Sequence, residues 1–277
     1  MTLSARNNIF KGGIIIACLS LCLTAACGYF AFQAFPEAAL QSTQRPAGIT
    51  QKLIENFTIP SAYVPFWTMF VSAAFSLISI LLILYFFEKT QTPEILYIGL
   101  FVISLAFEFT RIVIPLQEAV SLTAAYTIIA SRFLLFGRYF GLVSLFAASV
   151  YAAGLDAQRQ ETFLLMMLLA GLVIAIGVPI NSLVWDSTYM LSIGYETMFQ
   201  LVEKGMIVIT LISFFIAAYT RSSRNYLLTG IGVFMALAGR NILLYSDTWL
   251  TPFPGLALLA GGIWFACSKL HKEYLWL

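Results

Sequence analysis

Long apolar stretches recur along the whole chain and alternate with short polar segments. A stretch of about 20 apolar residues is long enough to cross the hydrocarbon core of a bilayer as an α-helix. The pattern therefore predicts an all-α, polytopic helical membrane protein whose residues 1–277 form a single transmembrane domain. Eight spans are predicted, at residues 12–33, 64–87, 95–115, 121–155, 162–180, 197–219, 226–245 and 254–269.

The composition supports this class of protein. Of the 277 residues, 60% are hydrophobic and 10% are charged, whereas soluble domains contain about 25% charged residues. No polar segment reaches the roughly 50 residues of a small soluble domain. The longest polar segment, residues 35–63, is predicted to be an outer loop. The net charge of +2 gives no indication of a nucleic-acid partner.

The lysine and arginine residues predict the orientation of the spans. If the N-terminus is inside, the outer loops contain only Arg45 and Lys52 of these residue types. Cytoplasmic segments are enriched in lysine and arginine, so both termini are predicted to be cytoplasmic, in the cytoplasmic membrane of a bacterium. The inner segments then contain Arg6, Lys11, Lys89, Arg159, Arg221, Arg224, Lys269 and Lys272.

The first span has a second interpretation, as a signal peptide. A basic start and an apolar stretch precede residues 23–27, which loosely imitate a lipoprotein cleavage motif ending at Cys27. Thr24 is a poor residue at its place in that motif, and the apolar stretch continues beyond Cys27. We expect the span to be retained, while cleavage would leave seven spans and an outer N-terminus.

A shift of the sequence on itself by 129 residues indicates an internal repeat. Residues 68–70 then match 197–199, and Arg111 matches Arg240. Such a repeat would be parallel, with ligand sites where the halves meet. Identities among apolar residues are common by chance, so both a tandem repeat of four spans each and a chance match stay open. The candidate halves are residues 1–155 and 156–277.

Charged residues inside the predicted spans are the candidate functional residues. Arg111 and Arg240 lie about 23 Å above the inner ends of their spans, and Glu108 lies one turn below Arg111. Glu203 and Lys204 lie about 10 Å below the outer surface. We predict that these residues and one further arginine line an outward-facing basic cavity for an anion. The candidate ligand-binding residues are Arg111, Arg240, Arg132, Lys204, Glu108 and Glu203.

The alternative for these charges is structural. Arginine side chains near a helix end can extend to the interface, and Glu108 with Arg111 can be an ion pair without a ligand. Arg138 lies about 25 Å from the outer surface and is predicted to be structural, at the inner interface.

The motifs of common enzymes are absent from the sequence. The single histidine, His271, excludes paired histidine ligands, and the sequence contains neither HExxH nor GxSxG. The four cysteines lie in predicted spans without zinc-site spacing, so neither a metal nor a cofactor is predicted. The sequence predicts a non-enzymatic protein that binds an anionic solute or a lipid head group from the outer face, for transport or sensing. The alternative is a structural or assembly subunit whose intramembrane charges contact the helices of partner membrane subunits.

Overall fold

A computed structural model describes residues 3–34, 60–61, 63–87, 92–120, 123–155, 160–180 and 184–276. Within these ranges, eight helical segments are long and apolar enough to cross a membrane, which confirms the predicted all-α fold and the predicted number of candidate spans. The third span combines three consecutive helices, α4, η1 and α5. The helices are α1 (Leu3–Ala34), α3 (Tyr63–Phe87), α4 (Pro93–Ser104), η1 (Leu105–Ile112), α5 (Val113–Val120), α6 (Ala124–Ala152), α7 (Gln160–Gly177), α8 (Glu196–Thr220), α9 (Arg224–Leu244) and α10 (Pro252–Trp276).

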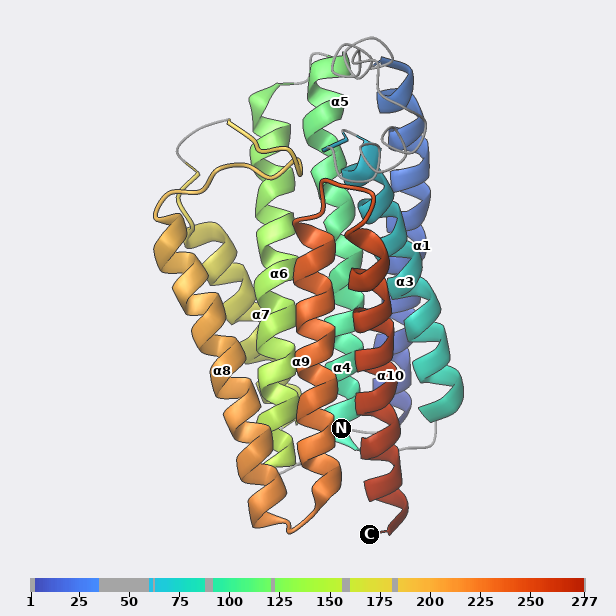
Figure 1. Ribbon diagram of the computed structural model, residues 1–277, viewed down its shortest axis with the longest axis vertical. Helices are drawn as coiled ribbons and strands as arrows, with labels where there is room; N and C mark the ends of the chain where they lie inside the picture. Colours follow the sequence, from blue (N-terminus) through green and yellow to red (C-terminus); the bar gives the residue numbers. More distant parts are fainter. Residues whose placement is uncertain are drawn as a thin grey trace, which may run out of the picture.

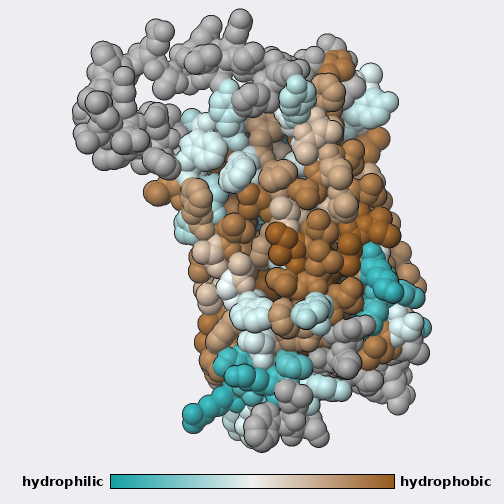
Figure 2. Space-filling model, turned by 90° about the vertical axis from the view of Figure 1, so that its right-hand side faces the viewer, coloured by the Kyte–Doolittle hydropathy of each residue, from teal (hydrophilic) through white to brown (hydrophobic). Residues whose placement is uncertain are grey.

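The helices run side by side as one elongated bundle, and both ends of the chain lie at the same end of it (Figure 1). This is the arrangement that an even number of spans requires. Figure 2 shows a broad apolar band across the middle of the face formed by α1 and α3, with hydrophilic residues gathered toward the lower end. The lower end is the predicted cytoplasmic side, and the upper end is the predicted outer face.

The interior of the bundle is built around α4 and η1. Almost every residue of α4 is buried, and α3, α6, α1 and α10 pack against this span. Helix α9 contacts it through the bond from Arg111 to the carbonyl oxygen of Leu244. By contrast, α7 and α8 lie at one side, where most of their side chains are exposed. Their exposed residues are largely apolar, so these two helices present a surface that suits lipid.

The backbones of α9 and α10 approach each other closely. A Cβ atom at Gly239 would lie 2.5 Å from the carbonyl oxygen of Gly255, and one at Gly262 would lie 2.5 Å from that of Gly232. Only glycine therefore allows the two backbones to approach so closely. Small residues permit such packing in membranes, where lipid chains give no hydrophobic drive for helices to associate.

The third span changes its helix type halfway. Residues Leu105–Ile112 form a 3-10 helix between two α-helical segments. A stretch of this length is unusual, because 3-10 geometry is strained beyond a few residues. In a 3-10 helix, side chains three residues apart lie directly above one another. This geometry aligns Leu105, Glu108 and Arg111 along one face.

The described residues do not test three of the predictions, which concern the outer loop, the repeat and the orientation. Apart from 60, 61 and 63, the predicted outer loop 35–63 lies outside the described residues. The repeat of halves 1–155 and 156–277 stays a prediction, as does the cytoplasmic position of the termini. The first span is an integrated part of the bundle, since Phe10 is buried against Gly99 and a Cβ atom at Gly13 would overlap Ile103.

Candidate functional site

Glu108 and Arg111 form an ion pair inside the bundle. Arg111 Nε lies 3.3 Å from Glu108 Oε2, and their side chains are 1% and 6% exposed. The 3-10 geometry of η1 brings the two side chains into line, because they lie three residues apart. The predicted pairing of these two residues is therefore present, and water has almost no access to it.

The two terminal nitrogens of the Arg111 guanidinium, Nη1 and Nη2, donate hydrogen bonds to three other parts of the chain. Nη1 donates to the carbonyl oxygens of Thr188 at 3.2 Å and Leu244 at 3.1 Å. Nη2 donates to the hydroxyl of Thr68 on α3 at 3.4 Å. Leu244 is the last residue of α9, so Arg111 satisfies a helix-end carbonyl that has no partner within its own helix.

Arg240 reaches the same interior from α9. It is 3% exposed, and its guanidinium lies 5.9 Å from the centre of the Phe101 ring. Arg240, Arg111 and Glu108 all line one small internal void of about 10 Å³. The two arginines that match in the candidate repeat thus meet at one place. That void is far too small for the solute or head group that the sequence analysis predicted for them.

A short hairpin before α8 forms the wall between these buried charges and a larger pocket. Trp185 pairs with Leu191, and the amide of Ser192 donates to the carbonyl oxygen of Val184 at 2.8 Å. Asp186 closes the turn, since its Oδ1 accepts from Thr188 N, Thr188 Oγ1 and Met190 N. The turn holds Tyr189 at a φ of 56°. Its tip descends into the bundle, where Met190 packs with Leu134 and Leu244.

The pocket lies between this hairpin, α6 and α8, toward the end of the bundle opposite the termini. Its volume is about 290 Å³, close to the lower limit of ordinary small-molecule sites. Its walls combine apolar and aromatic side chains with a few polar ones. The lining residues are Ser131, Leu134, Leu135, Arg138, Tyr139, Val184, Trp185, Asp186, Met190, Leu191, Ser192, Ile193, Glu196, Phe199, Gln200, Glu203 and Tyr245.

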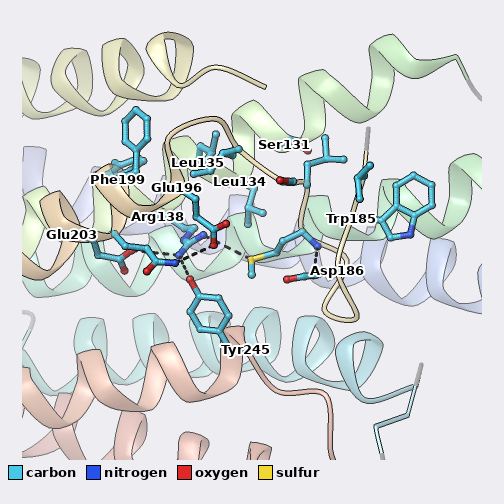
Figure 3. Close-up of a pocket in the computed structure, with 17 residues that line it drawn as sticks. Ser131, Leu134, Leu135, Arg138, Trp185, Asp186, Glu196, Phe199, Glu203 and Tyr245 are labelled. Carbon is cyan, nitrogen blue, oxygen red and sulfur yellow. Dashed lines mark hydrogen bonds and ion pairs between the residues drawn. The ribbon is translucent and has the colours of Figure 1, made fainter. Parts of the chain in front are cut away.

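Arg138 is the basic residue at the centre of this pocket. Its Nη2 lies 3.4 Å from Glu203 Oε2 and 3.1 Å from the hydroxyl of Tyr245, and its Nη1 lies 3.8 Å from Met190 Sδ. Figure 3 shows these contacts converging from three elements and the hairpin. The prediction that Arg138 belongs to the inner interface is wrong, because Arg138 lies midway along α6 and lines this pocket.

The pocket has an excess of negative charge. Among the described residues, its charged side chains are one arginine, Arg138, and the three carboxylates Asp186, Glu196 and Glu203. Asp186 is occupied by the hairpin turn, and Glu203 by Arg138. Glu196 accepts from the amide of Gln200 at 3.0 Å and is otherwise exposed. The predicted basic cavity is therefore absent from this part of the molecule, and the open pocket is acidic.

Two predicted site residues lie away from the pocket. Arg132 Nη1 donates to Ala175 O and Ile176 O at 2.6 Å, and also to Val178 O. These carbonyls are at the end of α7, so Arg132 satisfies a helix C-terminus in the way that Arg111 does for α9. Lys204 is exposed on α8. Neither side chain lines the pocket or the internal void.

Arginine capping of a neighbouring helix recurs at the other end of the bundle. Arg6 Nη2 donates to the carbonyl oxygen of Phe87, the last residue of α3, at 3.2 Å. Arg221 Nη2 donates to Tyr151 O near the end of α6 at 3.3 Å. Helix-end carbonyls inside a membrane lack water as a partner. This gives the arginines a structural role that the charge pattern alone did not reveal.

The sequence does contain a signal for the pocket that charge counting missed. Ser131, Leu134, Leu135 and Arg138 follow one another at intervals of three, one and three, and so share one face of α6. Glu196, Phe199, Gln200 and Glu203 repeat the same spacing on α8. Each of these faces places polar residues among apolar ones, and two such faces on neighbouring helices indicate a shared, partly polar interior. Nothing in the sequence pattern indicated the hairpin that completes it.

Among the described residues, no three histidine, cysteine or acidic side chains lie together as metal ligands would. The comparisons with known proteins add no functional assignment. No protein-family model matches the chain, and neither a curated protein nor a solved structure resembles it at a significant level. The function therefore has to be argued from the site itself.

Proposed function

We propose that the chain is a non-enzymatic membrane protein that binds a small organic amine from its predicted outer face, for transport or sensing. The observation that carries this proposal is the composition of the pocket, whose lining among the described residues contains one guanidinium and three carboxylates. Binding energy for a positively charged group is available there without any change of fold. Membrane lipids surround the protein in this account.

The positions of the basic residues argue against a larger anion. Arg111 and Arg240 line only the internal void, and Arg132 caps α7. An anionic solute or lipid head group would have Arg138 as its single partner in the pocket, and would have to compete with Glu203 for it. Its charge would also be repelled by Glu196 and Asp186.

The aromatic residues of the pocket suit the same ligand. Tyr139, Trp185, Phe199 and Tyr245 supply flat apolar walls on which the body of an amine can pack. The face of an aromatic ring also attracts a cation. The ammonium group would lie between Glu196 and Glu203. Arg138 would keep its hydrogen bond to Tyr245 as Glu203 turns toward the ligand.

The alternative role, as an assembly subunit, receives less support. It requires intramembrane charges that face partner helices, across surfaces that would otherwise contact lipid. Of the six predicted site residues, Lys204 alone is exposed on such a surface, and Arg111, Arg240 and Glu108 are buried inside the chain. A single lysine near a helix end can extend to the interface without a partner.

Matched aromatic probes of opposite charge test the proposal. Purified protein in detergent is titrated with phenethylamine and with 3-phenylpropionate, and binding is followed by calorimetry and by the unfolding temperature. We expect the amine to bind saturably and the acid not to bind. Glu203→Gln should lower the amine affinity about tenfold or more, since a hydrogen bond to a charged group contributes about 1.5–3 kcal/mol.

Lys204→Gln is the matched control, because it changes a charge at the neighbouring position on the exposed side of α8. It should leave the amine affinity unchanged. Preferential binding of the acid, or equal effects of the two substitutions, would contradict the proposal. Saturable binding of neither probe by a folded protein would contradict it as well.

A further inference from the structure

Arg240 is a buried cation whose hydrogen-bonding groups are largely unused. Its Nε and Nη1 atoms are fully buried and have no hydrogen-bond partner among the described residues. The ring of Phe101 attracts the charge but accepts no conventional hydrogen bond from it. A buried donor without a partner destabilises the folded protein, and more strongly when it is charged. We therefore expect a further hydrogen-bond acceptor beside the guanidinium of Arg240.

A place for such a partner exists directly beside it. The internal void that Arg240 lines has a volume of about 10 Å³, the lower limit for one water molecule, so a monatomic ion larger than water fits only when the surrounding leucine side chains move slightly outward. Its polar lining comes from Ser72, Glu108, Arg111 and Arg240, and leucine side chains form the remainder. The size excludes carboxylates, phosphates and organic molecules.

The charges around the void decide between water and an ion. Among the described residues, two guanidiniums and one carboxylate line it. Glu108 contacts Arg111 at 3.3 Å, and the other Arg111 nitrogens bond to Thr188, Leu244 and Thr68. Glu108 compensates the charge of Arg111 as an ion pair, although Arg111 Nε and Glu108 Oε2 make no hydrogen bond, so among the charges that line the void the positive charge of Arg240 remains in excess.

The carboxylates that attract Arg240 from nearby are Glu108 and Glu203, and each contacts a different arginine. A water molecule could accept the N–H groups of Arg240 but would leave the excess charge in the bundle interior. An uncompensated buried charge destabilises a protein by several kcal/mol. A monovalent anion provides both the acceptor and the opposite charge. We propose that the void beside Arg240 binds one monatomic monovalent anion, which is chloride under ordinary ionic conditions.

This site is separate from the amine pocket, and its test uses different ligands. Purified protein is unfolded by heat in increasing sodium chloride or sodium bromide, with sodium gluconate keeping the ionic strength constant. Gluconate is too large for the void. We expect the unfolding temperature to rise saturably with either halide and not with gluconate.

Three variants separate a bound anion from a general salt effect. Arg240→Gln should abolish the halide dependence, because it removes the excess charge. Glu108→Gln should lower the halide concentration at half-saturation about tenfold or more, because it adds one net positive charge to the lining. Lys204→Gln removes an exposed positive charge and should leave the dependence as in the unaltered protein.

Crystals of the unaltered protein grown in bromide give a test that needs no variant. The anomalous difference map should contain a peak within hydrogen-bonding distance of Arg240 Nε or Nη1. Density for water without anomalous signal at that place would overturn the proposal. So would an unfolding temperature that does not depend on halide, or a halide dependence that survives undiminished in Arg240→Gln.

Discussion

The guanidinium of Arg111 lies 3.2 Å from the carbonyl oxygen of Thr188, 77 residues further along the chain. This bond joins η1 in the centre of the bundle to the tip of the hairpin that walls the pocket. The same nitrogen holds the end of α9, close to Tyr245 in the pocket lining. A residue that never touches the pocket thereby determines where two of its walls lie.

Variants of the Glu108–Arg111 pair can separate an effect on the free energy of unfolding from an effect on amine binding. Arg111→Met breaks the buried ion pair with Glu108 and removes the charged donor to the carbonyl oxygens of Thr188 and Leu244, and should lower the free energy of unfolding by about 3–5 kcal/mol. Glu108→Leu combined with Arg111→Met removes both charges, and should recover much of that loss. Denaturant titrations measure both effects.

Amine binding should not recover in that double variant, because the hairpin still lacks its bond from Arg111 to Thr188. Calorimetry with phenethylamine measures it. Full recovery of affinity together with stability would mean that Arg111 does not position the hairpin. A double variant as unstable as Arg111→Met would show that Glu108 carries no uncompensated charge.

Arg132 gives a test of the capping role. Arg132→Gln removes charged hydrogen bonds to the end of α7 and should lower the free energy of unfolding by about 1–3 kcal/mol. Hydrogen exchange should become faster at residues 174–178 and stay unchanged in α9. Phenethylamine affinity should be unaffected. A loss of amine binding with normal exchange in α7 would instead indicate a ligand-binding role.

The α9–α10 contact predicts a large difference between two identical substitutions. Gly239→Ala would bring Cβ to 2.4 Å from Leu259 N, so the helices must separate. The cost should be about 1–3 kcal/mol or more, as for other overpacked sites. Gly205→Ala in α8 meets nothing within 4 Å and should be neutral or slightly stabilising. Unfolding temperatures measured side by side would contradict this packing if the two variants behaved alike.

The predicted orientation is open to chemical labelling in intact cells. In a background without the native cysteines, Leu250→Cys, between α9 and α10, should react with a membrane-impermeant thiol reagent. Ser222→Cys, between α8 and α9, should react only after the cells are opened. The reverse pattern would place the termini outside, and the pocket would then open to the cytoplasm.

Hydropathy predicted most of this fold because the bilayer fixes the length and polarity of each span. It also singled out Arg111 and Arg240, since charges inside apolar stretches are rare. It missed the pocket for two physical reasons. The depth of Arg138 was counted from the outer end of α6, as if the protein surface lay there. The hairpin instead reaches down beside α6 as far as Arg138, where Met190 contacts it. The counting also ignored helix-end carbonyls, which engage Arg132 and part of Arg111.

Trp185 lies in the wall of the pocket and reports on its occupant directly. Titration with 4-bromophenethylamine, a heavy-atom quencher, should reduce its fluorescence saturably, and phenethylamine should reverse the effect. The saturable component should vanish in Trp185→Phe and require higher concentrations in Glu203→Gln. Quenching by the amine that is identical in the unaltered protein and in Trp185→Phe would mean that no amine occupies the pocket.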